Sequence, residues 1–302
     1  VLLGRELEWW EAFTAALRMG AVVSPGTTQL SAKDFKYRLG AASATCIVTN
    51  AANAEKIDEV AASCPTLVTK VLIDGLCDGW LHYPTLLDKS EEDFAEINTA
   101  SNDESMCYFT SGTTGYPKMT IHTQDYALSH QVTGAHWLNL GENDLHWNIS
   151  DTGWAKAAWS SYFGPWTCGA ALFIHHSAGF NPGQTLTFIE KYPITTMCGA
   201  PTIYRMLVLE KLSNYDFGEL KHCVGAGEPL NPEIIDTWKN ATGITIRDGY
   251  GQTETGILCG NFHFIEPKFG SMGKPAPGIH LSVIDEDGNE VATNTEGDIA
   301  VR

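Results

Sequence analysis

The chain has 302 residues, 43% hydrophobic and 18% charged, so it can bury a full core and is neither disordered nor an array of repeats. Its formal net charge of −17 argues against non-specific binding to nucleic acid or to an anionic membrane. No apolar run approaches the roughly 18 residues of a membrane span. A site for an anion must therefore supply its own positive field or a metal ion.

Short β-rich runs alternate with helical patterns, which is typical of parallel sheets covered by helices. Proline just inside a helix start predicts three helices, at Asn181-Pro182, Ala200-Pro201 and Asn231-Pro232, with both asparagines as caps. The predicted strands are residues 46–49, 67–73, 106–109, 171–175, 194–198, 222–224 and 244–247. The run 168–174 suits a buried strand.

After about residue 263 the pattern changes to glycine- and proline-rich turns. Residues 279–284 and 297–301, with a turn at 285–288 after the first, predict an antiparallel hairpin. We therefore predict an α/β fold of mainly parallel sheet with helices, in three parts. A first α/β subdomain spans 1–148, a second spans 149–262, and the start of a small β-barrel spans 263–302.

Eight cysteines are scattered along the chain without metal-ligand spacing, mostly inside apolar runs. We therefore expect buried, reduced thiols and a reducing compartment such as the cytosol or the mitochondrial matrix. His122 follows a glycine-rich loop on a predicted helix, and His175-His176 ends a predicted strand. We interpret these histidines as structural rather than catalytic.

Residues 110–118 concentrate hydroxyls, glycines and one lysine where an apolar run stops. Glycines let backbone amides converge on phosphate oxygens, hydroxyls add donors, and Lys118 adds a fixed positive charge. The spacing is not the Walker pattern, because two residues separate the glycines and Met119 follows the lysine. An ordinary turn is the alternative reading of this segment alone. The candidate phosphate loop is Thr110, Ser111, Gly112, Thr113, Thr114, Gly115, Tyr116, Pro117 and Lys118.

Two further segments stand where strands should end, which is where open α/β sheets bind ligands. They are Gly225-Ala226-Gly227-Glu228-Pro229 and Asp248-Gly249-Tyr250-Gly251-Gln252-Thr253-Glu254-Thr255-Gly256. Glycines let a flat ring lie against the backbone, Tyr250 offers a stacking face, Thr253 a donor to phosphate, and Glu254 an oxygen ligand for Mg²⁺. The alternatives are ordinary turns and a solvated glutamate.

In this order the three segments resemble the adenylate-forming superfamily of acyl-CoA synthetases, luciferases and peptide-synthetase adenylation domains. The resemblance to the family covers nearly the whole chain, and Ser150-Asp151-Thr152-Gly153-Trp154 fits the family's order between the segments. Within the superfamily the chain is similar to the medium-chain acyl-CoA synthetases. This likeness rests on Pro25-Gly26-Thr27-Thr28-Gln29, on residues 151–154 and on residues 249–255.

The resemblance implies an AMP-forming acid-thiol ligase of fatty acid metabolism. Such an enzyme converts a medium-chain fatty or aromatic acid to acyl-AMP and then acyl-CoA, with ATP, Mg²⁺ and coenzyme A as cofactors. It implies that residues 110–118 bind the β- and γ-phosphates, that Thr253 binds the α-phosphate, and that Glu254 binds Mg²⁺. Lys118, Thr253 and Glu254 are thus the expected catalytic residues. Adenine would lie among Gly227, Glu228, Pro229, Asp248, Gly249, Tyr250, Gly251 and Gln252, and Gln29 would contact coenzyme A.

Position 251 carries the prediction about the acid. In the similar acetyl-CoA synthetases a tryptophan occupies this position, so we expect Gly251 to leave open the volume of a large aromatic side chain. A longer or aromatic acid would then gain about 0.8 kcal/mol per additional buried methylene. Trp154 is the expected wall of this pocket, and its alternative is a core residue.

The family pattern continues beyond residue 302 to a domain that carries the adenylation lysine, so we expect a central fragment that is inactive or nearly so by itself. The resemblance implies the mitochondrial matrix, or otherwise the cytoplasm, and indicates no oligomeric state. Two alternatives are a truncated nucleotide-binding pseudoenzyme and an adenylation domain that loads a carrier protein.

Overall fold

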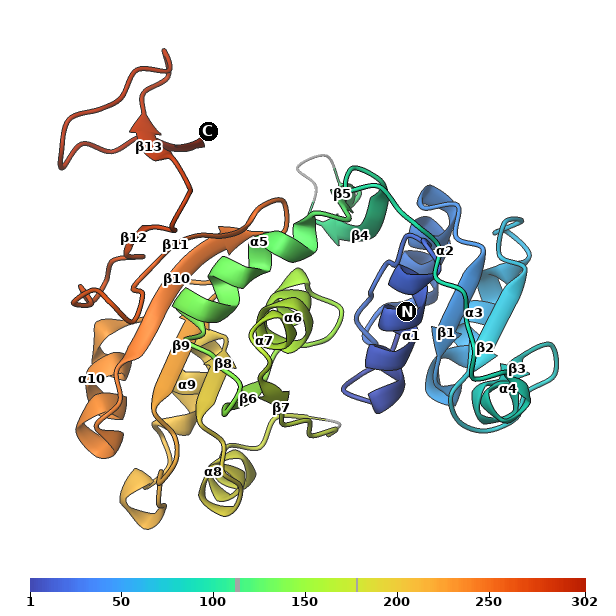
Figure 1. The fold of residues 1–302 in the computed structure, drawn as a ribbon, viewed down its shortest axis with the longest axis horizontal. Helices are drawn as coiled ribbons and strands as arrows, with labels where there is room; N and C mark the ends of the chain where they lie inside the picture. Colours follow the sequence, from blue (N-terminus) through green and yellow to red (C-terminus); the bar gives the residue numbers. More distant parts are fainter. Residues whose placement is uncertain (112–114, 178) are drawn as a thin grey trace. The chain divides into compact units, whose positions relative to one another are not determined.

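The chain divides into two units, and each is assembled from more than one stretch of sequence (Figure 1). The computed structural model describes residues 1–111, 115–177 and 179–302. The first unit comprises Val1–Leu128, Ser150–Ala158 and Ile174–Gly179, and the second comprises Ser129–Ile149, Trp159–Phe173 and Phe180–Arg302. The three-part division of the sequence stays a prediction.

The first unit holds a parallel sheet in the order β1-β2-β3 and an antiparallel pair, β4 and β5. Its helices include α2, whose N-terminus carries a capping box between Ser31 and Asp34, and whose buried residues Phe35 and Leu39 join the core. The elements are α1 (Leu7–Arg18), α2 (Ala32–Ala41), β1 (Cys46–Thr49), α3 (Ala51–Ala61), β2 (Thr69–Leu72), β3 (Leu81–His82), α4 (Tyr83–Lys89), β4 (Glu104–Thr110), β5 (Lys118–Thr123) and α6 (Ala155–Ala158).

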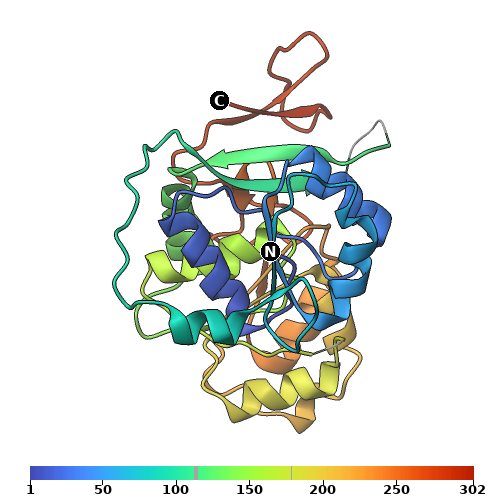
Figure 2. The same cartoon turned by 90° about the vertical axis from the view of Figure 1, so that its right-hand side faces the viewer.

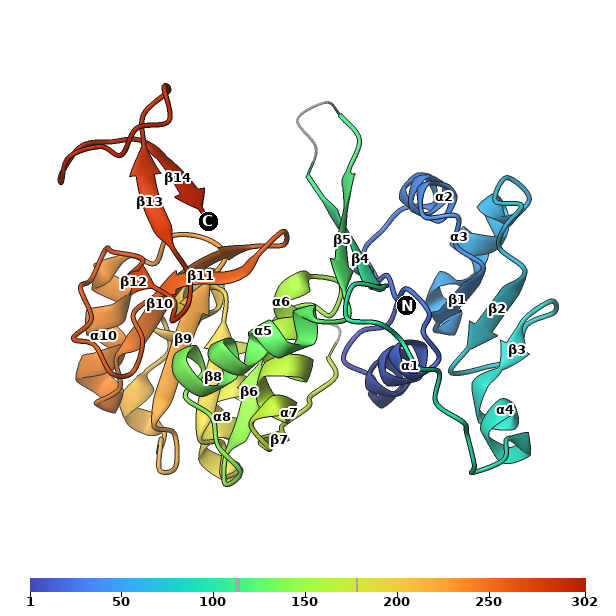
Figure 3. The ribbon, with the colours of Figure 1, turned by 45° about the horizontal axis from the view of Figure 1, so that its top comes forward.

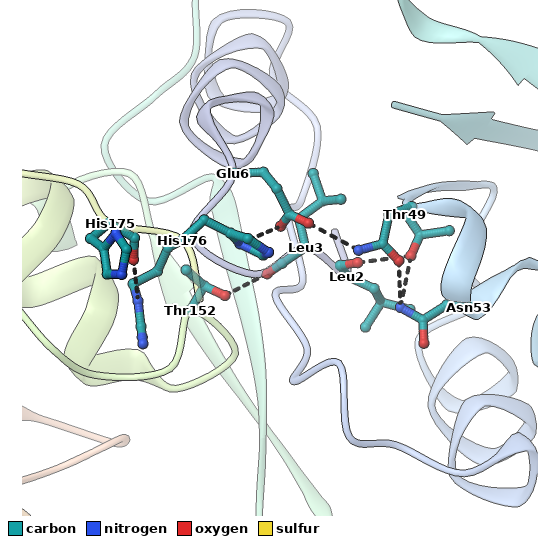
Figure 4. Close-up of polar contacts among 10 residues, drawn as sticks. Leu2, Leu3, Glu6, Thr49, Asn53, Thr152, His175 and His176 are labelled. Atoms are coloured by element: carbon teal, nitrogen blue, oxygen red, sulfur yellow. Dashed lines mark hydrogen bonds and ion pairs between the residues drawn. The ribbon is translucent and has the colours of Figure 1, made fainter. Parts of the chain in front are cut away.

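The first residues of the chain tie the separate stretches of the first unit together (Figure 4). Thr49 Oγ1, at the end of β1, donates to the carbonyl of Leu2 at 2.8 Å. On the other side, the buried Thr152 hydroxyl donates to the carbonyl of Leu3. Both carbonyls are thus satisfied, and the segment 150–158 is held against the N-terminus.

The second unit is built on a large sheet in the order β12-β11-β10-β9-β8-β6-β7, among the described residues. Neighbours from β10 to β7 are parallel, and β11 and β12 join antiparallel. The elements are β6 (Leu145–Asn148), α7 (Gly164–Thr167), β7 (Ala171–Leu172), α8 (Pro182–Lys191), β8 (Thr196–Gly199), α9 (Pro201–Leu207), β9 (His222–Ala226), α10 (Pro232–Thr242), β10 (Ile246–Gln252), β11 (Gly256–Gly260), β12 (Lys274–Pro275), β13 (Leu281–Ile284) and β14 (Asp298–Val301). Helix α5 (Tyr126–Val132) runs from the first unit into the second and continues as a π-helical turn, η1 (Thr133–Trp137). A second π-helical turn, η2, spans Trp159–Phe163, and a 3₁₀ turn, η3, spans Leu212–Asn214.

Both faces of the large sheet are buried, because alternate strand residues enter two different cores. Met197 and Cys223 point into a core shared with α8, α9 and α10, where Trp238 is fully buried. Their strand neighbours Cys198 and Val224 point into the other core, which contains η1. This double burial explains the continuous apolar runs that predicted parallel strands, and it confirms the predicted α/β class.

The three proline-marked helix starts are confirmed at Pro182, Pro201 and Pro232. Asn181 accepts a hydrogen bond from the Gln184 N–H at 2.9 Å, and Asn231 accepts one from the Glu233 N–H at 3.0 Å. Both asparagines are therefore N-caps, as the sequence predicts.

Two expectations need correction, and a third is confirmed in part. His122 lies on strand β5 and not on a helix, because residues 118–123 pair antiparallel with β4 (Figure 2, Figure 3). The run 168–174 is not a buried strand, since only Ala171–Leu172 pairs, at the edge of the large sheet, and His175 lies beyond it. In residues 263–302 the predicted hairpin is confirmed as the pair β13 and β14, with a turn closed by Asp285, but the described residues form no closed barrel.

No disulfide joins the eight cysteines, all of which lie in the described residues, and five of them are buried: Cys64, Cys107, Cys198, Cys223 and Cys259. Within 1–111, 115–177 and 179–302, no helix is both long and apolar enough to cross a membrane.

Two buried histidines stand on β6 and β9, two strands of the large sheet that flank β8. His146 Nδ1 lies 2.6 Å from Thr196 Oγ1, and His222 Nε2 lies 2.8 Å from the carbonyl oxygen of Trp137. Burial lowers the pKa of His146 to about 3 and the pKa of His222 to about 4. Both imidazoles are therefore neutral in the folded protein at neutral pH.

We expect the free energy of unfolding to fall as the pH drops below about 6.5. Between this value and the folded pKa values the unfolded chain binds protons on both histidines that the folded chain does not. Each such proton contributes a slope of about 1.4 kcal/mol per pH unit. Denaturant titrations between pH 5 and 6.5 test this, above the range where carboxylates titrate. The slope should fall in His146→Gln and His222→Gln and stay unchanged in a control, His280→Gln, at an exposed position.

Candidate functional site

The candidate phosphate loop joins the two strands of the β4–β5 hairpin (Figure 3). Thr110, the last residue of β4, pairs with Lys118, the first residue of β5, and Ser111 is exposed. Gly115 has φ of +96°, and a Cβ there would meet no heavy atom within 4 Å. The backbone at Gly115 thus needs glycine for its conformation and faces open space. Gly112, Thr113 and Thr114 lie outside the described residues.

Helix α2 holds the second arm of this hairpin. The Tyr37 hydroxyl donates to the carbonyl of Pro117 at 2.7 Å, and the Tyr37 ring stacks on Tyr116 with centroids 5.0 Å apart. The guanidinium of Arg38 lies 5.0 Å from the ring centroid of Phe109 on β4. Sequence reasoning missed Tyr37, because it lies 80 residues before its partner on a different element.

The two segments that carried the likeness to medium-chain synthetases meet in the first unit. Thr27 Oγ1 donates to Asp151 Oδ2 at 3.2 Å and accepts from the Gln29 N–H at 3.4 Å. Gly153 packs on the backbone of the same turn, since a Cβ there would lie 2.1 Å from Thr27 N. Gln29 is therefore held in a turn that is fixed by Asp151. The neighbouring Trp154 is 58% exposed, so its reading as a core residue is wrong.

The second unit carries the two segments proposed to bind adenine and metal. Residues 227–229 follow β9, and Gly227 has φ of +113° with open space where a Cβ would stand. The Glu228 carboxylate accepts from the Thr202 hydroxyl at 2.5 Å and pairs with Arg205 at 2.7 Å. These contacts lower the pKa of Glu228, with the Thr202 hydrogen bond as the largest cause. The carboxylate of Glu228 is therefore held by α9.

The segment 248–256 is the β10–β11 hairpin. The first half of β10 pairs parallel with β9, and from Gly249 onward it pairs antiparallel with β11. Thr255 closes the turn, because its N–H donates to the carbonyl of Gln252 at 3.1 Å and its hydroxyl accepts from the Gln252 N–H at 3.1 Å. Thr253 and Glu254 thus occupy the two central positions of this turn, at the tip of the hairpin.

At two positions of this hairpin, Gly249 and Gly251, the packing leaves no room for a side chain. A Cβ at Gly249 would lie 2.6 Å from Nε1 of the buried Trp137, so the flat ring beside this glycine is an indole of the protein. At Gly251 a Cβ would lie 1.8 Å from the carbonyl oxygen of Gly256, and the register shifts between Tyr250 and Gly251. The glycine therefore permits a bulge where β10 and β11 approach closely. The open volume expected beside Gly251 stays a prediction.

The described residues contain no group of three or more His, Cys, Asp or Glu side chains that could hold a metal ion. Mg²⁺ in nucleotide sites is usually held by one or two carboxylates and by substrate phosphates. A single exposed carboxylate at the tip of the β10–β11 hairpin, that of Glu254, fits this requirement.

In the second unit, glycine-rich turns follow β9 and β10, at the edge of the sheet where open α/β folds bind ligands. All residues from 1 to 302 match the family model described as AMP-binding enzyme, and the chain therefore belongs to that family. It is 46% identical over 304 residues to the mitochondrial acyl-coenzyme A synthetase ACSM3 of Homo sapiens, covering 100% of this chain and 52% of that protein.

Solved structures agree with this assignment. The chain is similar to the acyl-CoA synthetase of Brucella canis, with a TM-score of 0.91 and 30% identity, over 99% of this chain and 55% of that one. It is also similar to the anthranilate CoA ligase AuaEII in complex with anthranoyl-AMP, with a TM-score of 0.92 and 27% identity, over 100% of this chain and 60% of that one. The chain spans about half the length of the curated relatives it matches.

We expect Gly251→Ala to lower the melting temperature by several degrees, because its methyl group would force β10 and β11 apart at a cost of about 1–3 kcal/mol. Gly40→Ala is the matched control. Gly40 lies in α2 with nothing within 4 Å of a Cβ, so alanine should leave stability unchanged or raise it slightly. Equal melting temperatures for the two variants would show that the hairpin tolerates a side chain at position 251.

Proposed function

We propose that the full protein carrying this chain activates a carboxylic acid with ATP to form acyl-AMP and pyrophosphate, then transfers the acyl group to coenzyme A and releases AMP. The observation that carries the proposal is 46% identity along the entire chain to a protein named acyl-coenzyme A synthetase. We propose a medium-chain fatty or an aromatic acid as the substrate. The likeness at residues 25–29 and 151–154 supports this choice, and a structural relative holds anthranoyl-AMP.

The chemistry suits the residues present. A carboxylate is already a nucleophile at neutral pH, so the first step needs no general base. Its difficulty is that two anions must meet and pyrophosphate must leave, which makes electrostatic stabilisation the main requirement. We propose that Lys118 and the donors of residues 110–118 bind the β- and γ-phosphates, and that Thr253 binds the α-phosphate.

We propose Glu254 as the magnesium ligand. Bound Mg²⁺ would neutralise charge that develops on the phosphates. Gly227, Glu228, Pro229 and residues 248–252 are proposed to surround adenine, largely through their backbone. The engagement of the Glu228 carboxylate by α9 supports a backbone contact at this loop. Gln29 is proposed to contact coenzyme A. Because the relatives are named mitochondrial, we propose the mitochondrial matrix as the compartment.

We expect Lys118→Ala to lower ATP–pyrophosphate exchange about 100-fold in the full-length protein, since removing one preorganised donor or charge typically has an effect of this size. Exchange is measured with acetate, butyrate, octanoate and benzoate as separate acids, and the longer or aromatic acids should give the higher rates. Lys89→Ala, at an exposed position in α4, is the control. A loss within about threefold, or about 0.6 kcal/mol, would exclude Lys118 from phosphate binding.

We expect Glu254→Gln to raise the free Mg²⁺ concentration needed for half-maximal exchange by about tenfold or more. Glutamine preserves the size and turn position of the side chain and removes its charge. The measurement is the exchange rate against free Mg²⁺ at a fixed concentration of MgATP. Glu219→Gln, at an exposed position in the second unit, should give the wild-type curve. If the Glu254→Gln curve also overlaid that of the wild type, Glu254 would not be a ligand.

A further inference from the structure

Tyr37 makes two contacts with the hairpin arm that leads directly into Lys118. Its hydroxyl donates to the carbonyl of Pro117 at 2.7 Å, and its ring stacks on Tyr116 at an interplanar angle of 26°. The same ring stands edge-on to Phe109 of β4, with centroids 6.2 Å apart. One side chain of α2 therefore contacts both arms of the hairpin that flanks the candidate phosphate loop.

The hydrogen bond fixes more than one atom. The carbonyl of Pro117 and the N–H of Lys118 belong to one planar peptide group, so holding the carbonyl also sets the direction of the Lys118 N–H and the position of its Cα. Pro117 has a fixed φ and no N–H of its own. The arm thus has few remaining ways to rotate once the Tyr37 hydroxyl is bound.

Helix α2, which carries Tyr37, is itself held in place by its cap and by its buried face. Its N-terminus is closed by the capping box of Ser31 and Asp34, and its opposite face buries Phe35 and Leu39 in the core of the first unit. The hairpin side of the contact is different, because Tyr116 is 60% exposed and Lys118 is also exposed. The contact buries little apolar surface, so it adds little to global stability while it orients the arm.

We infer that Tyr37 is a positioning residue for Lys118. This inference rests on the proposed function, in which Lys118 binds the phosphates of ATP. Tyr37 touches no substrate in this account. It acts through Pro117 and Tyr116, so that the lysine is already oriented when the nucleotide arrives.

The test compares Tyr37→Phe, which removes the hydroxyl and keeps the ring, with Tyr37→Leu, which removes both. In ATP–pyrophosphate exchange by the full-length protein, Tyr37→Phe should raise the KM for ATP about fivefold, equivalent to about 1 kcal/mol, and leave the KM for the acid unchanged. Tyr37→Leu should raise the KM for ATP further. The control is Tyr83→Phe, which loses a comparable hydroxyl bond to Glu11 at 2.8 Å in the same unit.

Two further measurements separate positioning from a structural role. The melting temperature of Tyr37→Phe should match that of the wild type, and amide hydrogen exchange in residues 115–123 should become faster than in the Tyr83→Phe control. An unchanged KM for ATP would overturn the inference. So would a lower melting temperature with equal increases in both KM values.

Different results would overturn the proposed function and the inference about Tyr37. A wild-type protein that exchanges pyrophosphate with none of the acids would overturn the proposed function. Hydrogen exchange at residues 115–123 would then decide the inference by itself. Protection equal to that of the wild type in Tyr37→Phe would overturn it, and faster exchange would support it. If Tyr37→Leu failed to fold, Tyr37→Phe would still carry the test.

Discussion

The close approach of β10 and β11 is the constraint on which the second unit's candidate site depends. Strand β10 begins as a parallel neighbour of β9 and ends as an antiparallel neighbour of β11. At Gly251 the two backbones are so close that a Cβ would overlap the carbonyl of Gly256. A bulge at such a point increases the twist of the strand and redirects the residues after it. The direction of the turn that carries Thr253 and Glu254 is thus a consequence of a missing side chain at position 251.

Local signals made much of the fold predictable. Apolar runs predicted β8, β9 and β10 of the large sheet, and asparagine–proline pairs predicted the starts of α8 and α10, because these signals act within a few residues. Strand β5 was missed. Its six residues include Thr120, Ile121 and Thr123, which are β-branched, but only pairing with β4 makes them a strand. Such pairing depends on tertiary contacts, so it cannot be predicted from a short segment of sequence.

The segments of the candidate site were predictable, but the side chains that hold them were not. Tyr37 reaches Pro117 from 80 residues away, and Thr202 reaches Glu228 from 26 residues away. Glycine is ambiguous for a related reason, because a sequence shows that a side chain is absent without showing what fills the space. At Gly249 the neighbour is the indole of Trp137, and at Gly251 it is backbone. At both positions the space where a Cβ would stand is therefore filled by the protein.

The geometry of the β4–β5 hairpin also changes how an acidic chain could attract a polyphosphate. With a net charge of −17, the chain offers no attractive long-range field, and salt screens exposed charges beyond about 8 Å. A loop that opens a helix would add the positive end of the helix dipole. Residues 118–123 form a strand, and strands have only small net dipoles. Under the proposed function, the polyphosphate is therefore attracted to this loop only by hydrogen-bond donors at short range and by the charge of Lys118. Small displacements of that lysine would then be costly, which is why a contact such as that of Tyr37 matters at a surface where it buries little.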